Sequence, residues 1–194
     1  MFLAKYKNAI VRSAVILSIL ILSVVIGFVY QTLSDKADMA RYPQKYSEFV
    51  TKYSGEYGVP EYVIYSTIKV ESNFDSGAQS DAGALGLMQI MPSTFDWLVS
   101  LTQEGYETGM LYDPETNIKY GTYYLSYLYL KYADWETVYA AYNAGPANVD
   151  EWLADPECTD DDGKLKKIPF GETEKYVKKM TAAVGAYQKL YYDT

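Results

Sequence analysis

The feature that most constrains this 194-residue chain is an apolar run close to its N-terminus. No Asp, Glu, Lys or Arg occurs from Ser13 to Ser34, and residues 13–30 read SAVILSILILSVVIGFVY. This length approaches the roughly 20 apolar residues that a helix needs to cross a bilayer. We therefore predict a transmembrane helix, acting as a signal anchor, over residues 13–33.

Charge on the two sides of the run predicts its orientation. Lys5, Lys7 and Arg12 precede it, and no acidic residue occurs before Asp35. Because cytoplasmic flanks are enriched in Lys and Arg, we expect residues 1–12 in the cytoplasm and the rest outside a single-pass cell membrane. The alternative is a cleaved signal peptide, but the run exceeds the roughly 7–15 apolar residues of such a peptide, and YQTLSDKADMA offers no small-x-small cleavage site.

Beyond the run we expect a short linker over residues 34–41 and one domain over residues 42–194. This exported part holds all 25 acidic residues and 14 of the 17 basic ones, a formal charge of −11, which disfavours nonspecific binding of nucleic acid. Its only cysteine, Cys158, cannot form an intramolecular disulfide, so the core has to hold the domain together.

The chain contains no histidine. This removes Ser-His-Asp and Cys-His catalysis, His-containing zinc sites and HExxH metalloprotease chemistry. Carboxylates are therefore the leading candidates for acid–base catalysis in this chain.

Helical periodicity dominates the exported part, and no alternating strand pattern is present, so the fold class should be all-α with at most a minor hairpin. After Pro60, the residues Val63, Ile64, Thr67, Ile68 and Glu71 recur at offsets of three and four. This spacing places the carboxyl group of Glu71 on the apolar face of a helix.

Helix-capping residues and helix-breaking Gly and Pro predict the remaining helices and loops. Residues 72–87 are rich in Gly, Ser, Asp and Asn and read as a loop, and residues 143–146 read as a turn. Further helices are expected from Pro43 to Gly58, from Pro92 onward, from Asp113-Pro114 onward, from Trp135 to Tyr142, from Pro146 to Leu153 and from Glu172 to Tyr191.

Four ordered blocks carry a resemblance to a known family. The segment from Glu71 to Thr94, ESNFDSGAQSDAGALGLMQIMPST, closely resembles the signature of the lytic transglycosylase (SLT) domain, which has a lysozyme-like fold shared with goose-type lysozymes. Further matches are DPETNIKYGTYYLSYL at 113–128, AAYNAGPANV at 140–149 and IPFGETEKYV at 168–177. The similarity thus spans nearly the whole exported domain.

The resemblance implies an enzyme that cleaves peptidoglycan glycan strands. Glu71 occupies the place of the family's catalytic glutamate, and its predicted burial agrees, because desolvation raises a carboxyl pKa and suits it to act as an acid. Ser80 matches a serine thought to hydrogen-bond the substrate or the catalytic carboxyl. Gly83 and Gly86 would let a tight loop pass close to a sugar, although an ordinary turn explains them as well.

Four more residues are implied as substrate-binding. Met88 and Gln89 match a GLMQ element that lines the cleft, with the Gln89 amide able to hydrogen-bond sugar hydroxyl or acetamido groups. Tyr142 and Asn143 match an AYNAG element whose tyrosine helps to orient the glutamate in the family. No metal or cofactor is implied, and the sequence names no protein partner.

The expected reaction depends on the number of carboxylates. Ordinary glycosidases use two, whereas Asp75, Asp81 and Asp96, the available second acids, match no catalytic position. Goose-type lysozymes carry an aspartate two residues after the motif glutamine, where this chain has Met91. The resemblance therefore favours a lytic transglycosylase that forms a 1,6-anhydro-muramyl product with Glu71 as acid and then base. A hydrolytic muramidase and an inactive peptidoglycan-binding module are the alternatives.

Overall fold

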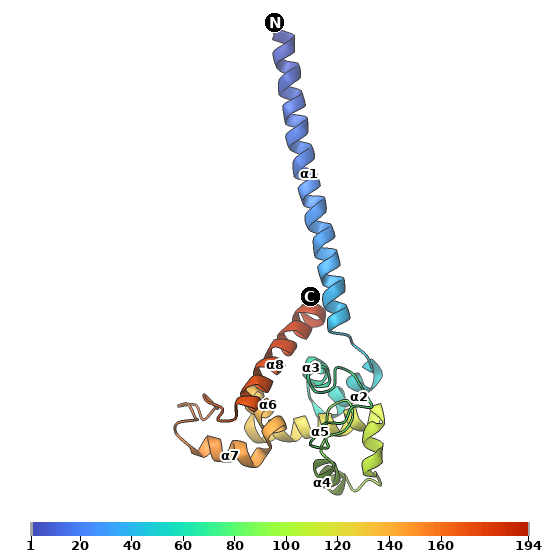
Figure 1. The fold of residues 1–194 in the computed structure, drawn as a ribbon, viewed down its shortest axis with the longest axis vertical. Helices are drawn as coiled ribbons and strands as arrows, with labels where there is room; N and C mark the ends of the chain where they lie inside the picture. Colours follow the sequence, from blue (N-terminus) through green and yellow to red (C-terminus); the bar gives the residue numbers. More distant parts are fainter. Residues whose placement is uncertain (1, 194) are drawn as a thin grey trace. The chain divides into compact units, whose positions relative to one another are not determined.

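The computed structural model describes the backbone of residues 2–193 and the side chains of residues 11–193. It divides into two compact units, residues 1–43 and 44–194. The first contains helix α1 (Phe2–Arg41), the long blue helix of Figure 1. The side chains of Lys5 and Lys7, on which the predicted orientation partly depends, lie outside the described residues.

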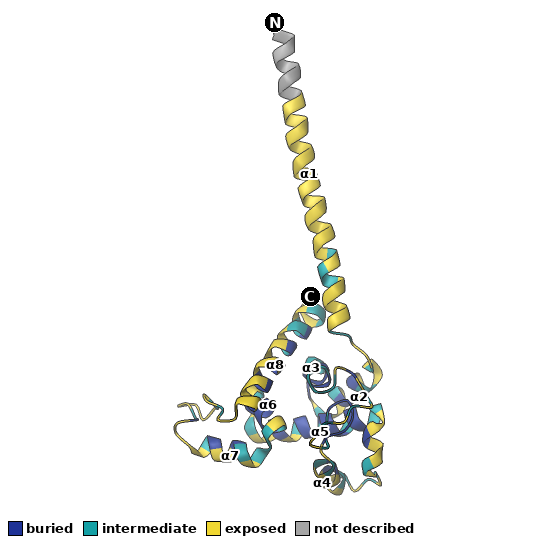
Figure 2. Ribbon diagram, in the orientation of Figure 1, coloured by how far each residue is buried: buried dark blue, intermediate teal, exposed yellow. Residues whose placement is uncertain are grey.

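Helix α1 is long and apolar enough to cross a membrane. The segment Val11–Arg41 reaches a mean hydropathy of 2.6 and is exposed almost throughout (Figure 2). Residues 34–41, which we expected as a linker, continue this helix, since the first proline after the apolar run is Pro43. A signal sequence meets the same criterion of length and composition, so membrane anchoring belongs to the proposal below.

The second unit is built from seven α-helices and two short helical turns within its described residues, which hold no strand. They are α2 (Ser47–Tyr57), α3 (Glu61–Glu71), α4 (Pro92–Thr102), η1 (Thr108–Tyr112), α5 (Pro114–Tyr132), α6 (Trp135–Ala144), α7 (Pro146–Ala154), α8 (Gly171–Tyr187) and η2 (Gln188–Tyr192). Only isolated antiparallel bridges occur, at Gln79–Leu85, Leu85–Ile90 and Thr159–Leu165. The predicted all-α class is confirmed.

Several predicted helix boundaries are confirmed with their physical causes. Gly58 ends α2 in the left-handed conformation, and Asp113 caps α5 by accepting a hydrogen bond from the Thr116 amide at 2.9 Å. Two boundaries differ. Helix α2 begins at Ser47 rather than near Pro43, and Asn143 belongs to α6, because the chain turns only at Gly145 with φ of 85°.

Helix α3 lies between two groups of helices, which also meet directly through α5 and α6 (Figure 1). It packs against α8, which with α6 and α7 forms one group, and against α2, which with α4 and α5 forms the other. The core is aromatic: Tyr65 of α3 and Tyr187 of α8 stack with ring centroids 5.5 Å apart, and within the other group Phe95 meets Tyr120 edge-on at 4.9 Å. The last residue of α3, Glu71, therefore lies where the two groups meet.

Candidate active site

Glu71 ends helix α3 on its inner side. The residues one turn earlier, Thr67 and Ile68, are fully buried, and the side chain of Glu71 is only partly accessible. The helix stops because Asn73 and Phe74 take the left-handed conformation, with φ of 53° and 67°. The predicted placement of Glu71 on the apolar face is confirmed.

The carboxyl group of Glu71 has one direct side-chain donor in the described chain. The hydroxyl of Tyr176, a buried residue of α8, donates to its Oε1 at 2.6 Å. Burial raises the pKa of Glu71 from its ordinary 4.5 to about 7, and the Tyr176 hydrogen bond partly opposes this rise by stabilising the anion. A carboxyl group with this pKa can both give and take a proton near neutrality.

The second tyrosine near Glu71, Tyr142, hydrogen-bonds the backbone and not the carboxyl group. Tyr142 of α6 lies close enough for the Glu71 charge to raise its pKa further, but its hydroxyl donates to the backbone oxygen of Met88 at 2.8 Å. The hydroxyl that orients the carboxylate comes instead from Tyr176, since α8 packs directly on α3. Tyr142 therefore holds the loop that follows Glu71.

Two polar side chains fix this loop against the helices. Ser72 donates to the Leu87 carbonyl at 2.7 Å. Asn117 of α5 accepts from the Met88 amide at 2.7 Å and donates to the carbonyls of Leu85 and Leu111 at 3.0 and 2.8 Å. Every hydrogen bond of this fully buried side-chain amide is to a backbone group, so Asn117 fixes the position of the loop.

Two predicted substrate residues close the loop on itself. The Ser80 hydroxyl accepts from the Ala84 amide at 3.0 Å, and the Gly83 amide donates to the Ser80 carbonyl at 2.9 Å. Neither residue lines either of the two cavities described below. Gly83 has φ of 90°, so it serves the tight turn that was the alternative explanation.

Gly86 and Met88 are packing residues rather than cleft residues. A side chain at Gly86 would collide with Leu111 O at 2.2 Å and with Asn117, so the close approach that needs this glycine is to protein backbone. The Met88 side chain is fully buried against Gly121 of α5, where an added Cβ would lie 2.4 Å from its sulfur. The expectation that the Met88 side chain lines the cleft is therefore wrong.

Gln89 and Asn143 do line a cavity. The amide nitrogen of Gln89 donates to the carbonyls of Gly86 and Ala78, at 2.9 and 3.2 Å. Its Oε1 can therefore accept a hydrogen bond from a ligand. The Oδ1 of Asn143 accepts from Thr173 at 2.8 Å, and this fixes the direction of its NH₂ group. Both residues border a cavity of about 260 Å³ that Met91 and Tyr142 also line.

A second cavity contains Glu71 itself. It measures about 360 Å³ and is lined by Val70, Glu71, Asn143, Glu172, Lys175, Tyr176 and Lys179. Asn143 borders both cavities, so the two adjoin at this residue. Glu71 lines one cavity, and Gln89 lines the other.

The second carboxylate at the site is one that sequence reasoning missed. Asp75, Asp81 and Asp96 are exposed and line neither cavity, whereas Glu172 of α8 borders the same cavity as Glu71. Tyr176, Thr173 and Glu172 were missed together. Glu172 and Thr173 precede Tyr176 by four and three residues, a spacing that predicts one shared helical face. This spacing could have identified them from the sequence.

Comparison with known proteins identifies the family. The Transglycosylase SLT domain family matches residues 48–163, which is more than half of the chain. The chain belongs to this SLT family. The matched range ends before α8, so Tyr176 and Glu172 come from the part of the SLT chain that follows it.

Relatives of the SLT chain carry consistent names. It is 37% identical over 153 residues to the soluble lytic murein transglycosylase of Escherichia coli K12, covering 76% of this chain and 24% of that protein. It is 36% identical to the membrane-bound lytic murein transglycosylase C of Edwardsiella ictaluri, covering 66% and 37%. The chain thus spans about a quarter of the length of the soluble relatives that it matches.

Solved structures agree in fold. The 70-kDa soluble lytic transglycosylase in complex with bulgecin A superposes with a TM-score of 0.74 at 35% identity, covering 81% of this chain and 26% of that one. An inactive glutamate-to-glutamine mutant of the lytic transglycosylase Slt from Pseudomonas aeruginosa superposes with a TM-score of 0.70 at 32% identity, covering 78% and 25%. The lysozyme-like expectation is confirmed at the level of the fold.

Proposed function

We propose that this protein is a membrane-anchored lytic transglycosylase that cleaves the β-1,4 bond between N-acetylmuramic acid and N-acetylglucosamine in peptidoglycan. The observation that carries the proposal is the setting of Glu71: a carboxyl with a pKa of about 7, oriented by Tyr176, in a cavity that adjoins a second one at Asn143. Membership of the SLT family and the names of its relatives support the substrate class.

In the first step the protonated carboxyl of Glu71 gives its proton to the glycosidic oxygen. The bond from muramyl C1 to that oxygen breaks, and the N-acetylglucosamine unit leaves with a free hydroxyl. Positive charge develops at C1 and is stabilised by the 2-acetamido group of the substrate. A pKa near 7 makes this transfer possible at neutral pH, because a substantial fraction of the enzyme still carries the proton.

In the second step the Glu71 carboxylate removes the proton from the muramyl C6 hydroxyl. The C6 oxygen attacks C1 and closes the 1,6-anhydro ring, and the proton taken from the C6 hydroxyl restores Glu71 to its acid form. Water is neither consumed nor released, so the reaction needs no second carboxylate. The Tyr176 hydroxyl holds the same carboxyl group in place through both steps, and its hydrogen bond is strongest when Glu71 is ionised.

The hydrolytic alternative requires a second carboxyl group at a defined distance, roughly 5–5.5 Å for retention or 6.5–9.5 Å for inversion. Glu172 is the only other acidic residue that lines either cavity in the described chain, and it is exposed at the start of α8. Met91 lines the adjoining cavity at the place where goose-type lysozymes carry an aspartate. An exposed Glu172 is poorly suited to hold one water, so we favour the anhydro product.

Product analysis tests both the activity and the reaction type. The full chain in detergent is incubated with peptidoglycan, and soluble fragments are examined by mass spectrometry beside Glu71→Gln and Glu172→Gln. We expect anhydro ends from the wild type and from Glu172→Gln, and no release from Glu71→Gln. Reducing ends one water heavier that disappear in Glu172→Gln would instead establish the muramidase. Undiminished release by Glu71→Gln would refute the role of this glutamate.

The membrane anchor and its orientation form a separate part of the proposal. Helix α1 supplies a span, and Arg12 is a positive residue before it with no acid on that side. We expect the chain to stay in the membrane fraction after alkaline washing and protease added outside cells to remove the domain. Release of a shortened chain into the medium would favour the cleaved signal peptide.

A further inference from the structure

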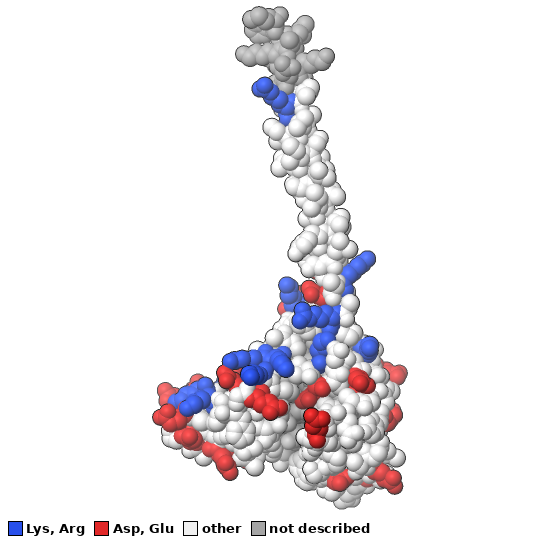
Figure 3. All heavy atoms as spheres, viewed as in Figure 1, with Lys and Arg blue, Asp and Glu red and all other residues white. Residues whose placement is uncertain are grey.

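Two lysines of α8 border the Glu71 cavity and have no part in the proposed mechanism. Lys175 and Lys179 are four residues apart, so they lie on one face of the helix, and both line the cavity together with Glu71. Helix α8 itself carries three lysines, and basic side chains cover its surface in Figure 3. Cations therefore gather at the cavity although the whole chain has a formal charge of −8.

Neither lysine is neutralised by an ion pair within the described chain. The ion pairs found there use Lys52, Lys119, Lys131, Lys164 and Lys178 instead. Two like charges at positions i and i+4 repel each other and slightly destabilise the helix. An anion placed between them would remove this repulsion and gain two charge-assisted hydrogen bonds.

The other charged groups at the cavity do not cancel this potential. Glu172 contributes one negative charge, and Glu71 contributes none while it is protonated, which is the state that accepts substrate in the acid step. The cavity then carries a net charge of +1. An anionic ligand is attracted while Glu71 is ready to act as an acid.

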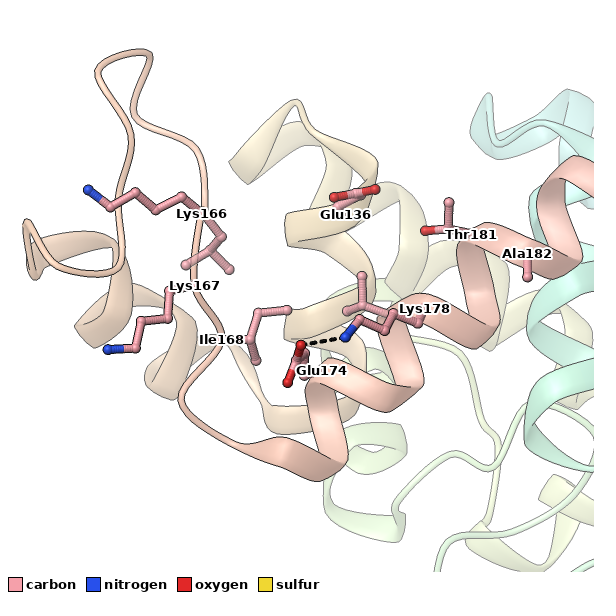
Figure 4. Close-up of a pocket in the computed structure, with 10 residues that line it drawn as sticks. Glu136, Lys166, Lys167, Ile168, Glu174, Lys178, Thr181 and Ala182 are labelled. Atoms are coloured by element: carbon pink, nitrogen blue, oxygen red, sulfur yellow. Dashed lines mark hydrogen bonds and ion pairs between the residues drawn. The ribbon is translucent and has the colours of Figure 1, made fainter.

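A larger cavity on another face of α8 provides a contrast. It measures about 730 Å³ and contains Lys166, Lys167 and Lys178. Figure 4 shows that Lys178 pairs with Glu174, while the ammonium groups of Lys166 and Lys167 point away from the helix. Glu136 also faces this space, so it offers no comparable pair of free cations directed inward.

We propose that Lys175 and Lys179 bind a carboxylate of the acidic peptide that a muramyl residue carries on its lactyl group, next to the bond that is cleaved. The inference rests on the proposed function, since it assigns the substituent of that same substrate. The lactyl group projects from the sugar ring, so a peptide attached to it leaves the glycan groove sideways. Lysines at the rim of the catalytic cavity are suitably located for such a branch.

The test compares one glycan in two charge states. Soluble, uncrosslinked glycan strands are divided, and the peptide carboxylates of one half are converted to uncharged amides. For the full chain in detergent at low salt, we expect kcat/KM to be about three- to tenfold higher on the acidic strands, as two partly exposed ion pairs would give. In Lys175→Gln/Lys179→Gln this ratio should fall towards one, and 0.5 M salt should lower it in the wild type.

The matched control is Lys166→Gln/Lys167→Gln, which removes the same charge from the other cavity and should keep the wild-type ratio. A ratio near one in the wild type, or an equal loss in the control, would overturn the inference while leaving the activity intact. Calorimetric binding of an acidic muropeptide and its amide to the Glu71→Gln chain separates the two questions. Lysine-dependent binding of the acid by the Glu71→Gln chain, together with a wild-type chain that releases no product, would uphold this site and refute the proposed reaction.

Discussion

Replacing Glu71 by glutamine should stabilise the protein at neutral and alkaline pH. At these pH values the buried carboxyl group is ionised, and burying its charge lowers the free energy of unfolding. In the folded state burial raises its pKa to about 7, whereas the unfolded chain has the ordinary value of 4.5. The proton is therefore bound more tightly in the folded state. Glutamine keeps the shape and can still accept the hydrogen bond from Tyr176, but it has no charge to bury.

The magnitude and its sign follow from this difference. One unit of difference in pKa corresponds to about 1.4 kcal/mol, so the change from 4.5 to about 7 amounts to at most about 3.5 kcal/mol. Below pH 4.5 Glu71 is neutral in both states and contributes nothing. Between pH 4.5 and 7 the unfolded chain ionises while the folded one stays protonated, so wild-type stability falls as pH rises. Above pH 7 the loss is complete and levels off.

Urea unfolding, monitored by tryptophan fluorescence, measures the free energy of unfolding of the wild type and of Glu71→Gln at pH 4, 6 and 8. We expect equal free energies of unfolding at pH 4 and a variant that is more stable by up to about 3.5 kcal/mol at pH 8. The melting temperature should then differ by roughly 2–4 °C for each kcal/mol. A difference that is independent of pH, or a variant that is less stable at pH 8, would refute the reasoning that burial sets the pKa of Glu71.

Three further substitutions test the site and its support. Tyr176→Phe removes the hydrogen bond that lowers the pKa of Glu71, so kcat should fall and the loss of activity at high pH should move to higher pH in a pH–rate profile. Gly121→Ala puts a methyl group 2.4 Å from the Met88 sulfur and should cost about 1–3 kcal/mol of unfolding free energy in urea. Asn117→Ala removes three hydrogen bonds to the backbone of Met88, Leu85 and Leu111 and should cost at least about 2 kcal/mol in the same assay, together with activity, because the loop is no longer held.

The sequence by itself determined the elements and the catalytic candidate. Period and caps placed α3 correctly between Pro60 and Glu71, and the register of Thr67 and Ile68 put the Glu71 carboxyl on the inner face. These are local properties, fixed by helical geometry within a few residues. The apolar run predicted α1 for the same reason, because length and hydropathy are read along the chain.

Tertiary structure decided which side chains surround that carboxyl. Tyr176 lies 105 residues from Glu71 and reaches it only because α8 packs on α3, and the same packing brings Glu172 and two lysines to the cavity. The family resemblance pointed to the loop after Glu71 as cleft lining. Yet Gly86 and Met88 pack against α5. No pattern within the loop sequence predicts that α5 approaches so closely. Contacts between distant segments depend on how helices pack, and helical periodicity defines only the faces that are available for packing.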